Sequence, residues 1–359
     1  MTTLTKLLEP YDTVVVIGPG GVGKTTTAAA VGALLAQQRR TCVLTIDPAK
    51  RLADALGIAE VGNEPVGVAV GSAHLDVVML DARATFESMI KRHARNEEHA
   101  AQIFANPVFA NLVTRLSGTQ EYMAFERLWE LRELDRYETV VVDTPPSQWA
   151  IDFLHAPARL ARFLDNRVFR FLLKPPPLIL RPLAVATRGL VRQIASVVGA
   201  QVVDDTIAFF QAFDGLEDGF RERASQTEAL LASERTAYVL VLTAEPDPIA
   251  VGRQLREALA ALGRDVVAVV VNRLPPDLDA APSDPEAPLE LRSLAAGLER
   301  ARRAGIDRVR HAFADLPLIA VEELSQPIAS TASLAQLVAA LGERELESQP
   351  TQRVDPADE

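Results

Sequence analysis

Short runs of apolar, often β-branched residues alternate along the chain with longer segments of helical periodicity. Such runs, bounded by helices, are typical of parallel strands buried on both faces. The pattern predicts an α/β fold, a doubly wound and mostly parallel sheet whose ligand lies at the carboxyl ends of the strands. The expected strands are 13–18, 41–46, 75–80, 138–142, 237–243 and 265–271, and the expected helices include 23–38 and 247–262.

Two long helical stretches interrupt this alternation. Each leaves the sheet after one strand and returns to it, so we interpret them as one helical subdomain made from two insertions. A proline-rich surface loop and a polar tail complete the organisation. The predicted core comprises 1–82, 136–147 and 233–344, the helical subdomain 83–135 and 148–232, the loop 274–288 and the flexible tail 345–359.

The first apolar run leads into a glycine-rich turn that is followed by a lysine and hydroxyl residues. Gly18, Gly23, Lys24 and Thr25 match the phosphate-loop pattern G-x-x-x-x-G-K-[ST]. Glycines let backbone N–H groups curl around phosphates, the lysine neutralises the β and γ oxygens, and the threonine hydroxyl ligates Mg²⁺. The following helix adds its positive dipole end. The residues expected to bind the nucleotide here are Gly20, Gly21, Val22, Gly23, Lys24, Thr25 and Thr26.

The same glycines also fit a dinucleotide-binding fingerprint. Gly18, Gly20 and Gly23 satisfy G-x-G-x-x-G, and Asp47 lies near the position of the acidic residue that binds ribose. A dinucleotide site has no need of a lysine and a threonine at the start of the helix. The strand, loop and helix order therefore favours a nucleoside triphosphatase.

Composition narrows the class further. The chain has 359 residues and a net charge of −11, which argues against general nucleic-acid binding. It has one cysteine, Cys42, so it can form neither an internal disulfide nor a cysteine metal cluster. The amino-terminal residues lack the pattern of a signal peptide, and prolines and charges interrupt the most apolar segment, 171–200. We therefore expect a cytoplasmic protein.

Two further expected strands end in an aspartate. Asp47 follows the strand at 41–46, and Asp143 follows the strand at 138–142. An aspartate that ends an apolar strand beside a phosphate loop is the usual carboxylate for the Mg²⁺ ion, and Asp143 fits that role through water. Strand-end aspartates also serve as simple caps, but two of them in a chain with a phosphate loop favour a functional site.

Three motifs together resemble the ArsA family of ATPases. They are Gly-Pro-Gly-Gly-Val-Gly-Lys-Thr-Thr from residue 18, Asp-Pro-Ala-x-x-Leu-x-Asp from residue 47 and Asp-Thr-x-Pro-Ser from residue 143. That family contains arsenite-pump ATPases and targeting factors for tail-anchored membrane proteins, and belongs to the deviant-loop class of MinD and ParA. The resemblance covers most of the chain.

The resemblance implies roles for particular residues. Asp47 would orient or deprotonate the attacking water in one switch segment, and Asp143 would open the other. Asn272 and the backbone of Pro317 and Leu318 would contact adenine. The segment after Asn272 is not the N-K-x-D box of a guanine-specific enzyme, so ATP is preferred over GTP.

One position departs from the family pattern G-K-G-G-x-G-K-[ST]. Its first lysine reaches across a dimer to the partner's nucleotide, and here that residue is Pro19. An in-trans cation can contribute roughly 10³–10⁵-fold to the rate. Two explanations stay open: a homodimer that is slow or uses another cation such as Lys50 or Arg51, or a heterodimer with a lysine-bearing family member, which we slightly favour.

The family's metal-binding cysteines are also absent. Arsenite pumps use cysteine thiolates, and some targeting factors share Zn²⁺ through cysteine pairs at the dimer interface. With Cys42 alone, arsenite transport is not expected and no zinc site is expected.

The second insertion holds a basic stretch within an acidic protein. Between Arg159 and Arg192 there are eight basic residues and one acid, interleaved with phenylalanine, leucine and isoleucine. It is either a surface for a hydrophobic client, an acidic partner or an anionic membrane, or a subdomain that packs its own core. The sequence leaves membrane contact open.

Taken together, the sequence predicts a Mg²⁺-dependent ATPase that switches a dimer between open and closed states and reports that state to a protein or hydrophobic client. The alternative is a non-hydrolysing nucleotide-binding subunit that regulates a catalytic partner. Pro19 supports the alternative, and the presence of both Asp47 and Asp143 opposes it.

Overall fold

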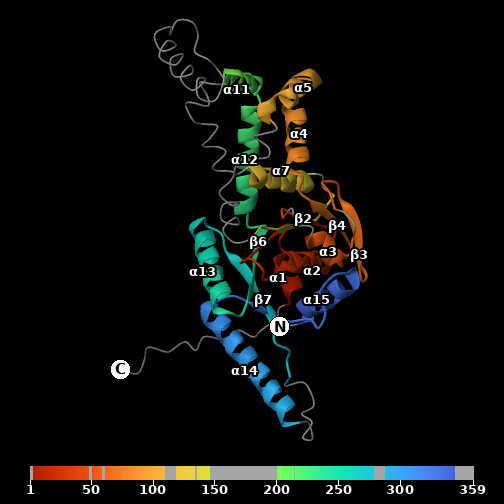
Figure 1. Cartoon of the computed structure of the whole chain (residues 1–359), viewed down its shortest axis with the longest axis vertical. Helices are drawn as coiled ribbons and strands as arrows, with labels where there is room; N and C mark the ends of the chain where they lie inside the picture. Colours follow the sequence, from red (N-terminus) through yellow and green to blue (C-terminus); the bar gives the residue numbers. More distant parts are fainter. Residues whose placement is uncertain are drawn as a thin grey trace, which may run out of the picture. The chain divides into compact units, whose positions relative to one another are not determined.

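The chain forms two compact units in the computed structural model (Figure 1). The structure describes residues 3–47, 51–58, 61–109, 119–133, 136–145, 200–213, 215–278 and 288–343. The first unit comprises Met1–Met79, Leu134–Ile151 and Glu234–Glu359, and the second comprises Leu80–Glu133 and Asp152–Ser233.

An eight-stranded sheet forms the centre of the first unit, in the order β3-β4-β2-β5-β1-β6-β7-β8. Every neighbouring pair is parallel except β3 and β4, which pair antiparallel at one edge. This confirms the predicted α/β class. The strands are β1 Thr13–Ile17, β2 Thr41–Thr45, β3 Val66–Val70, β4 Ala73–Met79, β5 Thr139–Asp143, β6 Thr236–Thr243, β7 Val266–Leu274 and β8 Leu318–Glu322.

The four central strands are buried along their whole length, as the unbroken apolar runs predict. Every residue of β1, β2, β5 and β6 is buried. Strands covered by helices on both faces need apolar side chains on both. By contrast β3, at the edge, alternates between exposed and buried residues in its second half, so its sequence carries a weaker signal.

Helices cover both faces of this sheet because successive strand side chains point to opposite faces. Val14, Val16, Val239 and Val241 pack in one hydrophobic core with residues of α1, α2, α3 and α15. Leu240 and Leu242 point the other way, towards Gly252 of α13. The helices of this unit are α1 Leu4–Leu8, α2 Lys24–Ala36, α3 Arg51–Leu56, α13 Pro246–Ala261, α14 Leu289–Ala312 and α15 Thr331–Glu343.

The described part of the second unit is helical, as predicted for the insertions. Its aromatic core joins Phe86 to Phe109, Phe213 and Phe220, with ring centroids 5.4 to 6.3 Å apart. Aromatic pairs at this spacing stabilise a core beyond the burial of their area. The helices are α4 Ala82–His93, α5 Glu97–Ala105, α7 Thr119–Glu133, α11 Ala200–Ala212 and α12 Glu217–Ala232.

Several predicted features lie outside the described residues. These are the basic stretch 159–192, most of the surface loop 274–288, Lys50 and the tail 345–359. Within the part of the chain that the structure describes, no helix is both long enough and apolar enough to span a membrane.

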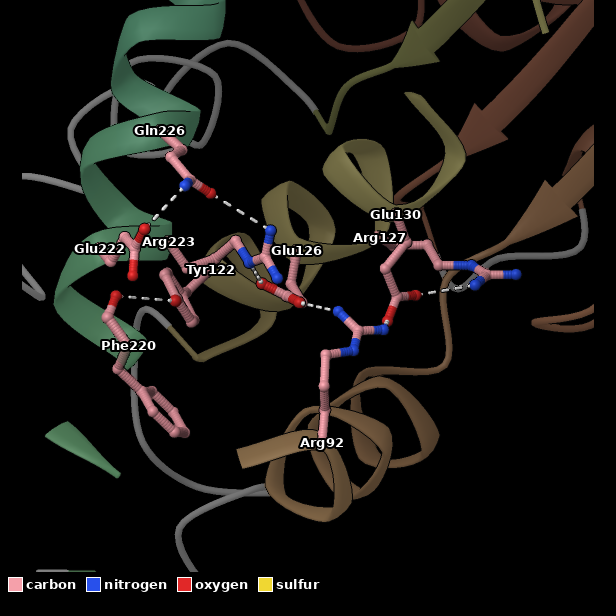
Figure 2. Close-up of polar contacts among 9 residues, drawn as sticks. All are labelled: Arg92, Tyr122, Glu126, Arg127, Glu130, Phe220, Glu222, Arg223 and Gln226. Carbon is pink, nitrogen blue, oxygen red and sulfur yellow. Dashed lines mark hydrogen bonds and ion pairs between the residues drawn. The ribbon is translucent and has the colours of Figure 1, made fainter. Parts of the chain in front are cut away.

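A network of buried charges joins three helices of the second unit (Figure 2). Glu126 of α7 has a fully buried side chain and lies 3.1 Å from Arg92 of α4 and 3.2 Å from Arg223 of α12. The Arg223 contact is an ion pair without good hydrogen-bond alignment. Glu130, one turn along α7, binds Arg92 at 2.5 Å and Arg127 at 2.8 Å.

An aromatic side chain also contacts this network. Arg223 stacks over the ring of Trp129, 3.0 Å from its centroid, which fixes the guanidinium beside Glu126. Burial raises the pKa of Glu126 to about 7, while Arg223 and Arg92 oppose the shift. Removing one partner of a buried ion pair is costly because the other charge stays buried. The packing of α4, α7 and α12 against one another therefore depends on the carboxylate of Glu126.

We predict that this carboxylate makes the stability of the helical unit pH-dependent. Because the pKa of Glu126 is raised, the folded protein keeps a proton that the unfolded chain releases between pH 4.5 and about 7. Stability therefore falls as pH rises through that window. Glu126→Gln removes this contribution. The melting temperature of the wild type minus that of Glu126→Gln is expected to decrease from pH 5 to pH 7, and a constant difference would contradict the prediction.

Candidate nucleotide site

A glycine-rich turn between β1 and α2 has the backbone shape that a phosphate loop requires. Gly18, Gly21 and Gly23 have φ angles of 155°, 79° and 91°, which other residues rarely adopt. Gly23 is the amino-terminal cap of α2, so the helix begins directly at Lys24. The first N–H groups of the helix have no partner within it and face the turn.

Neighbouring strands leave no room for a side chain at two glycines of this turn. A Cβ at Gly18 would lie 2.0 Å from the carbonyl oxygen of Val241, and one at Gly23 would lie 2.4 Å from Nδ2 of Asn272. The same Asn272 Nδ2 donates a hydrogen bond of 2.8 Å to the carbonyl of Val22. Asn272 therefore holds the loop from β7. Its predicted contact with adenine stays a prediction.

Lys24 is buried beneath the loop. Its Nζ donates a hydrogen bond of 2.7 Å to the carbonyl of Pro19. Pro19 stands where the family has its first lysine, and its backbone carbonyl therefore still takes part in the site. Burial lowers the pKa of Lys24 to about 8, while Asp143 and Asp47 raise it and Arg51 lowers it. An ammonium group with so little water around it interacts strongly with a phosphate that takes the place of the Pro19 carbonyl.

Asp143 lies at the end of β5 and is fully buried. In the parallel register it is level with Val16 of β1 and Thr45 of β2, so all three reach the same edge of the sheet. The Thr45 hydroxyl donates a hydrogen bond of 2.8 Å to Oδ2. Burial raises the pKa of Asp143 to about 6, against hydrogen bonds from Thr25 and Thr45 and the charge of Lys24.

The second oxygen of Asp143 is available for a ligand. Oδ1 is buried and has no hydrogen-bond partner among the described residues, while the Thr25 hydroxyl also interacts with the carboxylate. Mg²⁺ is usually held by one or two protein oxygens together with waters and phosphates. The Thr25 hydroxyl and this orphaned carboxylate oxygen fit that donor set. No cluster of three acidic, histidine or cysteine ligands occurs within the described ranges.

Asp47 and Thr144 also lie at the carboxyl edge of the sheet. Asp47 follows β2, and Arg51, the first residue of α3, lies 3.4 Å from its Oδ2. The Thr144 hydroxyl donates a hydrogen bond of 2.7 Å to the carbonyl of Val16, which fixes the chain after β5 against β1.

A cavity of about 390 Å³ lies over the loop, and several of these residues line it. The sequence-predicted residues among them are Gly21, Gly23, Lys24, Thr25, Thr26 and Asp47. The structure adds Arg51, Asp54, Ala55, Thr144, Arg273 and Ile328. Gly20 and Val22 belong to the same loop.

A second cavity of about 390 Å³ adjoins the first and shares Gly23, Thr26, Arg273 and Ile328 with it. Its remaining lining comes from Asn272 of β7, the carboxyl end of β8, the segment after it and α15. Apart from the shared residues and Asn272, these residues are Val321, Glu322, Glu323, Leu324, Gln326, Pro327 and Leu337. The mixture of apolar and polar groups suits a nucleoside.

Pro317 and Leu318 do not reach either cavity. Leu318 begins β8 and pairs with Val269, in the middle of β7, while the loop lies at the carboxyl edge of the sheet. Their expected contact with adenine stays a prediction. A parallel strand presents its ligand edge at its carboxyl end, and Glu322 and the residues after it line the adjoining cavity.

The strand, turn and helix with a lysine and a threonine define the protein as a P-loop nucleoside triphosphatase. A family model described as anion-transporting ATPase, the ArsA type, matches residues 11–343. The chain therefore belongs to this family, and the protein is an ATPase.

Individual relatives agree with the family. The chain is 28% identical to a protein named ATPase GET3 from Malassezia globosa over 72% of this chain and 71% of the relative. It is 24% identical to an ATPase ASNA1 homolog from Entamoeba dispar over 72% and 75%, respectively. A protein from Halobacterium salinarum named as an arsenical pump-driving ATPase is 34% identical, over 41% of this chain and 24% of that protein.

Three residues at this edge of the sheet were not assigned a role from the sequence: Thr45, Thr144 and Arg273. Thr144 belongs to the motif Asp-Thr-x-Pro-Ser, but a threonine at a strand end does not by itself indicate which atom it will bind. The position of both threonines depends on the strand register, which is seen only once β2, β5 and β1 are paired.

We predict that Thr45 sets the properties of Asp143. Thr45→Val removes the hydroxyl at nearly constant volume and leaves Oδ2 of a buried carboxylate unpaired. Loss of a buried partner costs about 1–3 kcal/mol, so denaturant unfolding should show a destabilisation of that order. Thr45→Ser should restore the wild-type value. In addition, Thr45→Val should require more Mg²⁺ for nucleotide binding, and equal stability of Thr45→Val and Thr45→Ser contradicts the role.

Proposed function

We propose that this ATPase binds Mg²⁺·ATP in the loop cavity and uses hydrolysis as a conformational switch. The observation that supports this most directly is the meeting of Lys24, Thr25, Asp47 and Asp143 at the carboxyl edge of one sheet. A site that only binds nucleotide has no need of two aspartates beside the phosphates.

Each residue has a distinct role in this proposal. The loop amides and Lys24 hold the β and γ phosphates, and Lys24 exchanges its bond to the Pro19 carbonyl for phosphate oxygens. Asp47 positions the attacking water, with Arg51 fixing its carboxylate. The nucleoside occupies the adjoining cavity beside Asn272.

Thr25 and Asp143 would hold the Mg²⁺ ion, with Asp143 acting through water. When bound, the ion supplies charge stabilisation on the β and γ phosphoryl oxygens. Thr45 and Thr25 keep the Asp143 carboxylate in place, and Thr144 ties the following segment to β1. Release of the γ-phosphate would free the segments after Asp47 and Asp143.

The switch acts through a dimer in this proposal, either a homodimer or a heterodimer with a lysine-bearing family member. The partner's lysine would compensate for Pro19 in the heterodimer. The client is a hydrophobic or acidic protein that docks on the basic stretch 159–192, and the protein works in the cytoplasm. The support is the family membership and the composition of that stretch.

Steady-state ATP hydrolysis by the purified chain, with Mg²⁺ and beside a Lys24→Ala control, tests the proposal. Turnover that disappears in the control shows a site that is complete in this chain and contradicts an obligate heterodimer. Nucleotide binding without turnover supports a partner that donates the missing cation. Binding of neither ATP nor ADP contradicts the proposed site.

Substitutions at residue 19 separate charge from backbone stiffness. If residue 19 faces the nucleotide of a second copy, Pro19→Lys raises turnover over Pro19→Ala by roughly tenfold or more, since an in-trans cation contributes roughly 10³–10⁵-fold. Pro19→Ala is the matched control, because it removes the ring without adding charge. Equal turnover of the two variants contradicts a homodimer with residue 19 at the partner's nucleotide.

A further inference from the structure

Arg273 has an unusual backbone beside the loop cavity. Among the described residues it is the sole one other than glycine with a positive φ, at 55°. The pairing of β7 with β8 also shifts register between Val271 and Leu274, so the strand bulges here. A non-glycine residue in this conformation costs free energy, and such strain clusters where a side chain is aimed at a ligand.

At the bulge, two consecutive residues have different surroundings. Asn272 is buried and holds the carbonyl of Val22 in the loop. Arg273, the next residue, is exposed and lines both cavities. It shares this boundary with Gly23, Thr26 and Ile328, none of which carries a charge. Arg273 therefore supplies the charge at the junction of the two cavities.

The other cations of the loop cavity are already engaged. Lys24 donates to the Pro19 carbonyl, and Arg51 lies 3.4 Å from Asp47. Arg273 has no hydrogen-bond or ion-pair partner in the part of the chain that the structure describes. In the adjoining cavity Glu322 lies 3.4 Å from Arg302, which leaves Glu323 as the remaining acid near Arg273.

We propose that Arg273 binds the phosphate chain of the nucleotide at the phosphate nearest the ribose. This rests on the proposed placement of ATP, with its phosphates over the loop and its nucleoside in the adjoining cavity. The guanidinium of Arg273, at the junction of the two cavities, would then lie beside the phosphate that links the phosphate chain to the nucleoside. Guanidinium is well suited to phosphate, because its fork of donors matches two oxygens.

Direct binding of ADP and adenosine to Arg273 variants tests this inference. Arg273→Gln should weaken ADP binding by about 10- to 100-fold, as expected for loss of a hydrogen bond to a charged group. Adenosine, which lacks phosphate, should compete equally well for the wild type and the variant. Arg273→Lys, which keeps the charge, should recover part of the ADP affinity. Raising the salt concentration should weaken ADP binding less in Arg273→Gln than in the wild type.

Arg273→Gly separates the side chain from the strained backbone. Glycine adopts this φ without cost, so the variant should be as stable as the wild type or more stable, yet bind ADP as weakly as Arg273→Gln. Arg253→Gln, which removes an exposed arginine of α13 outside both cavities, is the matched control and should change nothing.

The outcomes distinguish this inference from the proposed function. Wild-type ADP affinity retained in Arg273→Gln and Arg273→Gly overturns the role of Arg273 alone. An equal loss of ADP and adenosine binding overturns the phosphate contact in favour of a nucleoside contact. No ADP binding by the wild type overturns the proposed placement of the nucleotide itself.

Discussion

The site depends on two opposite charges that are buried together under the glycine-rich loop. Lys24 and Asp143 have almost no access to water. Burial disfavours the charged form of each, whereas the charge of Asp143 raises the pKa of Lys24 and the charge of Lys24 lowers the pKa of Asp143, so that each favours the charged form of the other. Burying two charges is costly unless they are paired and hydrogen-bonded. Each side chain makes one such bond: Lys24 to the carbonyl of Pro19 at 2.7 Å, and Oδ2 of Asp143 to Thr45 at 2.8 Å. The Asn272 amide fixes the loop above them, and Oδ1 of Asp143 is left without a hydrogen-bond partner among the described residues.

The sequence predicted the sheet and the loop well because both rest on local patterns. Apolar runs such as 138–142 and 237–243 became buried central strands, and the spacing from Gly18 to Thr25 led directly to the turn and helix. The local pattern at Pro317 and Leu318 does not show which end of a strand they occupy. Their segment does belong to the sheet, but they lie at the amino end of β8, whereas ligands bind at carboxyl ends.

Other features depend on tertiary structure and leave no trace in a single sequence. In α7, Glu126, Arg127 and Glu130 look like the exposed face of a charged helix, and only packing against α4 and α12 buries them. Arg273 looks like any arginine at the end of a strand, because residue type does not reveal a bulge or a φ of 55°. Thr45 becomes important only through its register with Asp143.

We propose that Lys24, Thr25 and Asp143 together hold Mg²⁺·ATP. The affinity for a non-hydrolysable ATP analogue, measured with and without Mg²⁺ in the wild type and in Asp143→Asn, tests this directly. Mg²⁺ is expected to tighten binding by the wild type, and Asp143→Asn is expected to lose this effect while still binding the metal-free analogue. Wild-type affinity that does not respond to Mg²⁺, or an unchanged Mg²⁺ effect in Asp143→Asn, would contradict it.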